Sequence, residues 1–169
     1  MPTDINMSRK SEILSYLGPA TKVAVVVLTL ALIAEKSAEI SALPFVEGDL
    51  KTNLLMIPAF WVSLLAPGFY LCALWTASDV FERLNKGDAF TEAVVKGLKD
   101  IGRNLITGAV AAILIAPSLA PLLEDGFHGF RGIRFNLEIE SLTIGLIGLI
   151  LYLLAKQGQS LKSELESII

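Results

Sequence analysis

Few side chains in this sequence could carry out chemistry, and none has the spacing that chemistry needs. His128 is the only histidine and Cys72 the only cysteine, so a zinc or haem site built by this chain alone is not expected. No G-x-S-x-G, H-E-x-x-H or phosphate-binding loop motif occurs. We therefore predict that the protein is not an enzyme and holds no metal and no cofactor.

The distribution of charge indicates a membrane protein. Hydrophobic residues make up 53% of the chain and charged residues 18%, and the charges cluster so that four apolar stretches lie between them. The three best apolar stretches contain no Lys, Asp, Glu or His, which argues against a proton relay or an ion-coupled carrier. A net charge of −3 is too small to imply a nucleic-acid partner.

We predict an all-α membrane protein, a single domain over residues 1–169 with four transmembrane helices. The first helix is expected to start at Pro19, since proline suits a first helical turn, and Lys22 would then reach the lipid headgroups. Two alternatives remain open: a cleaved signal peptide, and three spans with the first apolar stretch lying in the interface. The predicted spans are about 19–38, 54–78, 104–123 and 139–157.

Between the second and third spans, residues 79–103 predict a short cytoplasmic helical hairpin. Phe81 and Leu84 fall on one face of a continued helix, and Gly87 suits the left-handed residue that ends it. Thr91 is a natural N-cap for the next helix, and Phe90 before it can pack back like a hydrophobic staple. This hairpin is either a simple re-entry turn or a docking surface for a partner.

Small residues predict close helix packing in the third and fourth spans. Gly108, Ala112 and Ala116 recur every four residues, on one face of a helix, and Gly145 belongs to a second small-residue pair. Prolines in the second span predict a kink. The second outer loop carries a different pattern, because apolar and polar residues alternate over 133–140, which predicts a short β segment in need of a partner strand.

The positions of the basic residues predict the orientation. Four spans with the amino terminus inside place ten of the fourteen Lys and Arg residues on the inner side. Basic residues favour the cytoplasmic side of a membrane. We therefore expect both termini in the cytoplasm.

Two segments resemble a known family. The first runs Phe81-x-x-Leu84-x-x-Gly87-Asp88-x-Phe90-Thr91 and continues to Leu98-x-x-Ile101-Gly102, and the second is the last span with its tail. Over roughly residues 74–169 the chain resembles the bacterial membrane proteins called domain-of-unknown-function family 2975. The resemblance implies four spans and no assigned chemistry, and it hints at pairing with a small helix-turn-helix regulator. Glu92, Ala93 and Val94 replace the basic residues that the family usually has there.

These observations favour a non-catalytic accessory or interaction subunit that packs against a larger membrane complex. Its partners would be membrane lipid and other membrane subunits. The first alternative is a regulatory membrane protein whose loop 79–103 binds a cytosolic regulator. The second is a small channel or exporter, which needs oligomerisation to line a pore. The residues predicted to pack or to contact a partner are Phe81, Leu84, Gly87, Phe90, Ile101, Gly102, Gly108, Ala112, Ala116 and Gly145.

Overall fold

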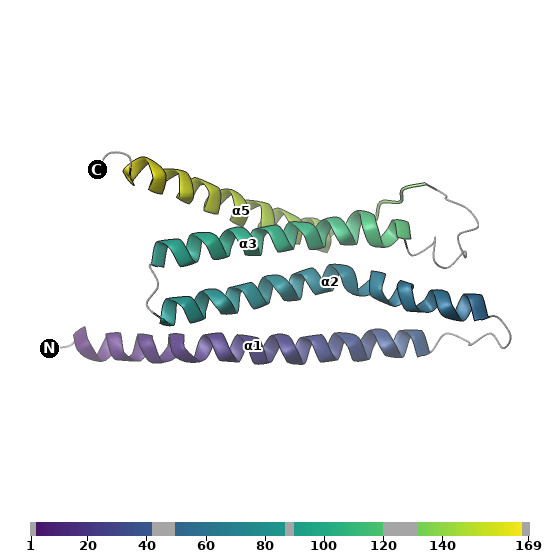
Figure 1. Cartoon of the computed structure of the whole chain (residues 1–169), viewed down its shortest axis with the longest axis horizontal. Coiled ribbons are helices and arrows are strands. Elements are labelled where there is room, and N and C mark those ends of the chain that lie inside the picture. Colours follow the sequence, from purple (N-terminus) through teal and green to yellow (C-terminus); the bar gives the residue numbers. More distant parts are fainter. Residues whose placement is uncertain (1–2, 42–49, 87–89, 120–131, 167–169) are drawn as a thin grey trace.

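The computed structural model describes residues 3–41, 50–86, 90–119 and 132–166, and these are almost entirely helical (Figure 1). Three long helices precede the second outer loop, and the last of them passes into a π-helical turn and a further helical stretch over 116–119. One long helix follows the loop. The elements are α1 (Thr3–Ser41), α2 (Leu50–Asn85), α3 (Phe90–Val110), the π-helix η1 (Ala111–Ile115) and α5 (Ile139–Glu166).

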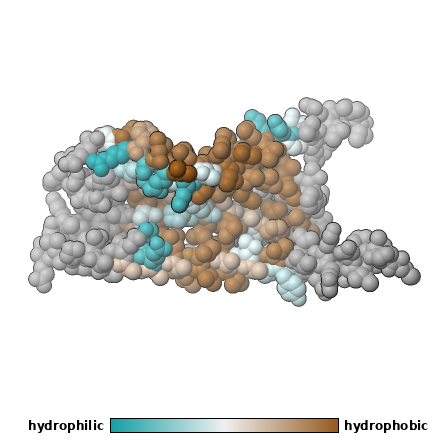
Figure 2. Space-filling view, turned by 180° about the vertical axis from the view of Figure 1, so that it is seen from behind, coloured by the Kyte–Doolittle hydropathy of each residue, from teal (hydrophilic) through white to brown (hydrophobic). Residues whose placement is uncertain are grey.

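Four of these helical stretches are long and apolar enough to cross a membrane: Tyr16–Ala38, Phe60–Asn85, Glu92–Leu119 and Ile139–Ser160. Many of their large hydrophobic side chains are exposed, as lipid contact requires. Figure 2 shows, on the face that it draws, a hydrophobic band across the middle and hydrophilic residues toward both ends. The prediction of four apolar helices is confirmed, and the chain has the make-up of a multi-pass membrane protein.

Helix α1 begins well before the predicted position. It starts at Thr3 and contains Pro19, so the expectation that the helix starts at Pro19 is wrong. Proline removes only one helical hydrogen bond, and membrane helices tolerate this loss better than soluble ones. In α2, Pro58 and Pro67 also lie inside the helix, and Figure 1 shows α2 bending along its length, as the prolines predict.

The helices pack in the order of the chain. Within the described residues, the backbone of α1 packs closely only on α2, α2 also packs on α3, and α5 packs closely only on α3 and η1. The side chains of Tyr70 on α2 and Ser141 on α5 also interact. The bundle is therefore an open row (Figure 1), and little of it is interior. The buried apolar residues of the described part are small: Val25, Ala66, Ala73, Ala93, Ala109, Ala111 and Ala155.

The third span loses its regular helix near its end. The N–H of Ala116 donates to the carbonyl of Ala111, five residues back, and this bond defines the π-helix. Pro117 has no backbone N–H, so the carbonyl of Ile113 lacks its α-helical donor. That carbonyl instead accepts the N–H of Asn136 at 3.0 Å. A proline in the helix thus creates the acceptor that holds the segment after the outer loop.

Residues 132–138 are extended but form no strand, so the predicted β segment is wrong in the described part of the loop. The Ser118 hydroxyl donates to the Arg134 carbonyl and accepts the Arg134 N–H, both at 3.1 Å. Together with the bond from Asn136, these contacts attach the segment to the end of the third span. The alternating apolar side chains stay 62–67% exposed: Ile133, Phe135 and Leu137.

The start of the first helix and the end of the last helix lie at the same end of the bundle. Figure 1 shows the start of α1 and the end of α5 at the same end of the bundle, where α2 is also connected to α3. A chain that crosses a membrane an even number of times has both of its ends on the same side. Around the predicted hairpin, α2 runs to Asn85 and α3 begins at Phe90, so Thr91, the predicted N-cap, lies inside the helix. Gly87 lies outside the described residues.

Candidate functional site

A polar clamp joins α1 to α2 near the end that carries the termini. The Lys22 ammonium group lies 2.7 Å from Glu82 Oε1 and 3.3 Å from Asp79 Oδ1. It also lies 5.5 Å from the centre of the Trp75 ring, within the range of a cation–π contact. One cation on α1 is therefore held by two carboxylates and an aromatic ring on α2. All four groups are partly exposed, so water and headgroups screen the clamp.

A buried hydrogen bond joins α1 and α2 next to the clamp. Ser78 is fully buried, and its hydroxyl donates to the Gly18 carbonyl at 2.7 Å. A Cβ at Gly18 would lie 3.0 Å from Glu82 Cγ, so glycine lets the two backbones approach. A hydrogen bond of this kind contributes about 1 kcal/mol net to stability. Together, these contacts fix the position at which α1 crosses α2.

Helices α3 and α5 meet with almost no side chain between them. A Cβ at Gly102 would lie 2.6 Å from the Gly148 carbonyl oxygen and 2.7 Å from the Tyr152 nitrogen. A Cβ at Gly148 would lie 2.7 Å from Leu105 Cβ and 2.9 Å from the Gly102 oxygen. Gly145 lies near this crossing, against Ala109. Backbone therefore packs on backbone here, as small residues permit in membrane helices.

Glycines also set the distance between α2 and α3. A Cβ at Gly108 would lie 2.7 Å from Tyr70 Cδ1 and 3.1 Å from Phe69 Cβ. A Cβ at Gly97 would overlap the Val80 side chain. Gly97 and Gly108 of α3 each receive a larger residue of α2, which is the packing expected for a small-residue face.

The outer face of α5 is apolar and has no partner helix in the described part of the chain. Four of its exposed leucines are spaced four, three and four residues apart, and they are between 44% and 58% exposed: Leu142, Leu146, Leu149 and Leu153. Ile147, Ile150 and Leu154 of the same helix are exposed as well. This spacing is the heptad pattern by which one helix inserts side chains into the surface of another. The face is suited to contact a further helix.

The residues predicted from sequence fall into several places. Gly102 is buried between α3 and α5, and Gly108 between α2 and α3. Phe90 is the first residue of α3, but its side chain, like Gly87, lies outside the described residues. The half-buried members are Phe81, Leu84, Ile101, Ala112, Ala116 and Gly145. The π-helix changes the register of the predicted ridge, so that Ala111 is fully buried while Ala112 is not.

Metal-binding side chains do not cluster in the described part of the chain. In the residues that the structure describes, no three side chains of His, Cys, Asp or Glu come together as a metal site would require. Cys72 is exposed on α2, and His128 lies outside the described residues. The acidic groups near one another, Asp79 and Glu82, are both occupied by Lys22.

A family model described as "Protein of unknown function (DUF2975)" matches residues 34–169. The chain belongs to this family. The DUF2975 match confirms the resemblance seen in the sequence, and it covers α2, α3, η1 and α5. Gly18 and Lys22 precede the matched residues, so only the α2 half of the clamp lies within the DUF2975 match. No curated protein and no solved structure matches the chain.

The sequence reasoning missed the clamp. It assigned Lys22 to the lipid headgroups, because a lysine in the first turn of a span usually extends toward them. The available signal was the spacing of Asp79 and Glu82, three residues apart at the inner end of the next span. Two carboxylates on one helix face, next to a lysine at the same depth on the preceding helix, predict an ion pair between the helices.

Proposed function

We propose that this protein is a non-catalytic accessory subunit that packs against a larger complex in a bacterial inner membrane. The observation that supports the proposal is the leucine stripe on the outer face of α5, since α5 has a neighbour on one side only within the described residues. Lipid can cover such a face, but lipid does not require heptad spacing. The occupant that fits the stripe is a transmembrane helix of another protein.

The proposal includes the orientation of the chain in the membrane. The inner segments would carry most of the basic residues, so both termini face the cytoplasm. Reporter domains fused at Met1 and at Ile169 are expected to be active in the cytoplasm. Reporters in opposite compartments would contradict the four-span arrangement itself.

The decisive experiment is purification in a gentle detergent followed by mass spectrometry of the co-purifying proteins. Replacing Leu146 and Leu149 by alanine should remove the partner, because the two side chains lie at the centre of the stripe. The matched control replaces Val23 and Val27 of α1, which are 63% and 58% exposed, by alanine and should leave the partner bound. A wild-type protein that purifies as a lone, monodisperse species would refute the accessory role.

A second candidate is a regulatory membrane protein whose hairpin 79–103 binds a cytosolic regulator of the helix-turn-helix type. Its support is the polar end of the hairpin, where the side chains of Arg83, Asn85 and Lys86 are exposed. Replacing Phe81 and Phe90 by alanine should then abolish co-purification of the regulator, and unchanged recovery would exclude it. A channel or exporter is the weakest candidate, and it predicts solute flux in liposomes containing only this protein.

A further inference from the structure

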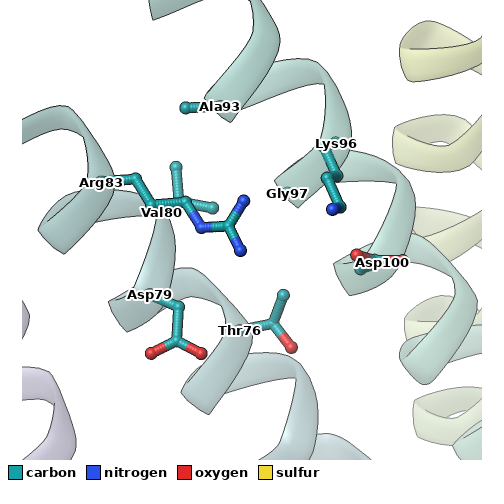
Figure 3. Close-up of a pocket in the computed structure, with 8 residues that line it drawn as sticks. All are labelled: Thr76, Asp79, Val80, Arg83, Ala93, Lys96, Gly97 and Asp100. Atoms are coloured by element: carbon teal, nitrogen blue, oxygen red, sulfur yellow. The ribbon is translucent and has the colours of Figure 1, made fainter. Parts of the chain in front are cut away.

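A polar cleft of about 180 Å³ lies between α2 and α3, near the hairpin that connects them. Its wall on α2 includes Thr76, Asp79 and Arg83, and its wall on α3 includes Lys96, Gly97 and Asp100 (Figure 3). The cleft is therefore lined by two basic and two acidic residues. It lies outside the α3–α5 crossing and the α5 leucine stripe, but within the hairpin 79–103.

Two basic side chains line the cleft from opposite helices. In Figure 3, the Arg83 guanidinium extends from α2 toward α3, and Lys96 lies on the α3 wall of the cleft. Neither forms an ion pair within the described part of the chain, whereas the neighbouring Lys22 and Arg103 both do. Both side chains are exposed, so both positive charges are accessible to an anion from outside the chain.

The two acidic residues do not neutralise these charges, because each is paired with a different cation. Asp79 contacts Lys22 of α1 at 3.3 Å, and its carboxylate points away from Lys96 in Figure 3. Asp100 contacts Arg103, one turn further along α3, at 3.6 Å. The negative charge at the rim is thus partly neutralised, while Arg83 and Lys96 keep their charge at the walls of the cleft.

The shape of the cleft is fixed by contacts between the two helices. Gly97 packs directly against Val80, leaving no space for a Cβ. The Asn104 amide donates to the Thr76 hydroxyl at 3.4 Å, which links α2 and α3 on the other side of the cleft. The two basic groups are therefore held by helices that already touch, so a ligand does not have to draw the helices together.

We propose that this cleft binds a phosphate group between the guanidinium of Arg83 and the ammonium of Lys96. Guanidinium presents paired N–H donors that match two phosphate oxygens, and ammonium adds a compact positive charge. The volume is several times the roughly 30 Å³ of one water molecule, which leaves room for a tetrahedral group. Basic pockets between membrane helices at the headgroup level bind anionic phospholipids, and free phosphate has the same chemistry.

The test titrates the purified full-length protein in neutral detergent with phosphatidylglycerol, with phosphatidylcholine and with inorganic phosphate. Native mass spectrometry follows the lipids and calorimetry follows inorganic phosphate. The variant Arg83→Gln/Lys96→Gln should bind phosphatidylglycerol or phosphate at least about tenfold more weakly, because each charged hydrogen bond to an anion is strong. The control Lys86→Gln/Lys99→Gln makes the same change in net charge at residues that do not line the cleft, and it should bind within about twofold of the wild type.

The three ligands distinguish the source of the phosphate. Cleft-dependent binding of phosphatidylglycerol alone assigns a lipid headgroup, and cleft-dependent binding of inorganic phosphate assigns the free anion. Equal weakening in both double variants would show only general attraction to a basic surface and would overturn the proposal. So would a wild-type protein that does not prefer phosphatidylglycerol to phosphatidylcholine and does not bind phosphate, and that result needs no variant to fold.

Discussion

Alanine at Gly102 should weaken the contact between α3 and α5 more than its single added methyl group suggests. The new Cβ would lie 2.6 Å from the Gly148 carbonyl oxygen, about 0.8 Å closer than the 3.4 Å at which ordinary contact begins. It would also lie 2.7 Å from the Tyr152 nitrogen. Both neighbours are backbone atoms of one helix, so no side chain can rotate away and the helices must move apart.

Overpacking of this kind costs roughly 1–3 kcal/mol. Helix propensity works in the opposite direction, since alanine exceeds glycine by about 1 kcal/mol in a helix interior. The steric cost prevails at Gly102, because separation of the helices also removes the contacts of Gly148 with Leu105 and Ile106. For a chain of this size the melting temperature should fall by about 2–12 °C before the propensity gain is subtracted.

The assay is thermal unfolding in detergent, followed by tryptophan fluorescence, with Gly68→Ala as the matched control. Gly68 lies inside α2 and has no atom within 4 Å of an added Cβ. It should therefore show only the propensity gain, with an unchanged or slightly raised melting temperature. If Gly102→Ala were as stable as Gly68→Ala, the close backbone contact between α3 and α5 would be refuted.

Three further substitutions test the other contacts. Lys22→Met should lower the melting temperature, since it leaves two carboxylates on α2 without their cation, and Lys22→Arg should restore most of the stability. Ser78→Ala should cost about 1 kcal/mol in the free energy of unfolding, because the buried hydrogen bond to α1 is lost. Pro117→Ala should supply the missing helical N–H, compete for the carbonyl that Asn136 uses, and speed hydrogen exchange at the Asn136 amide.

Each of these has an outcome that contradicts it. If Lys22→Met had the melting temperature of the wild type, solvent screening would leave the ion pairs of Lys22 with no net contribution to stability, as is found for many exposed pairs. Ser63→Ala is the control for Ser78→Ala, since the Ser63 hydroxyl is exposed and bonds within its own helix. If both substitutions lowered the free energy of unfolding equally, the buried hydrogen bond between α1 and α2 would contribute nothing beyond an ordinary serine bond. Unchanged exchange at Asn136 in Pro117→Ala would show that the added N–H does not compete with Asn136 for the Ile113 carbonyl.

The sequence predicted the features that depend on composition and spacing. Uninterrupted apolar runs identify membrane helices because the bilayer imposes their length and forces the backbone to satisfy its own hydrogen bonds. Gly108 could be recognised because small residues at helical spacing permit close packing, whereas Gly102 was named from the motif that carries the family resemblance. The spacing does not identify which helix packs on each small-residue face, since any neighbouring helix could pack there.

The features that were missed depend on contacts between distant residues. Lys22 has the same local sequence whether it extends to headgroups or reaches Glu82, sixty residues later in the chain. The alternation at 133–139 predicts a strand only if another extended segment accepts its hydrogen bonds. In the structure, the Ser118 hydroxyl accepts the Arg134 N–H and donates to the Arg134 carbonyl instead. The Ile113 carbonyl accepts the Asn136 N–H. Pro117 lacks a backbone N–H, but the sequence does not show which donor the Ile113 carbonyl finds instead.

The order in which the helices touch bears on how the chain is made. In the described part of the protein, each long helix packs closely only on the one synthesised before it and the one synthesised after it. The close packing of each pair of helices can therefore form as soon as the later helix leaves the insertion machinery, and only side-chain interactions such as that of Tyr70 with Ser141 wait for a later segment. Assembly in this membrane can proceed one hairpin at a time, at the pace of translation.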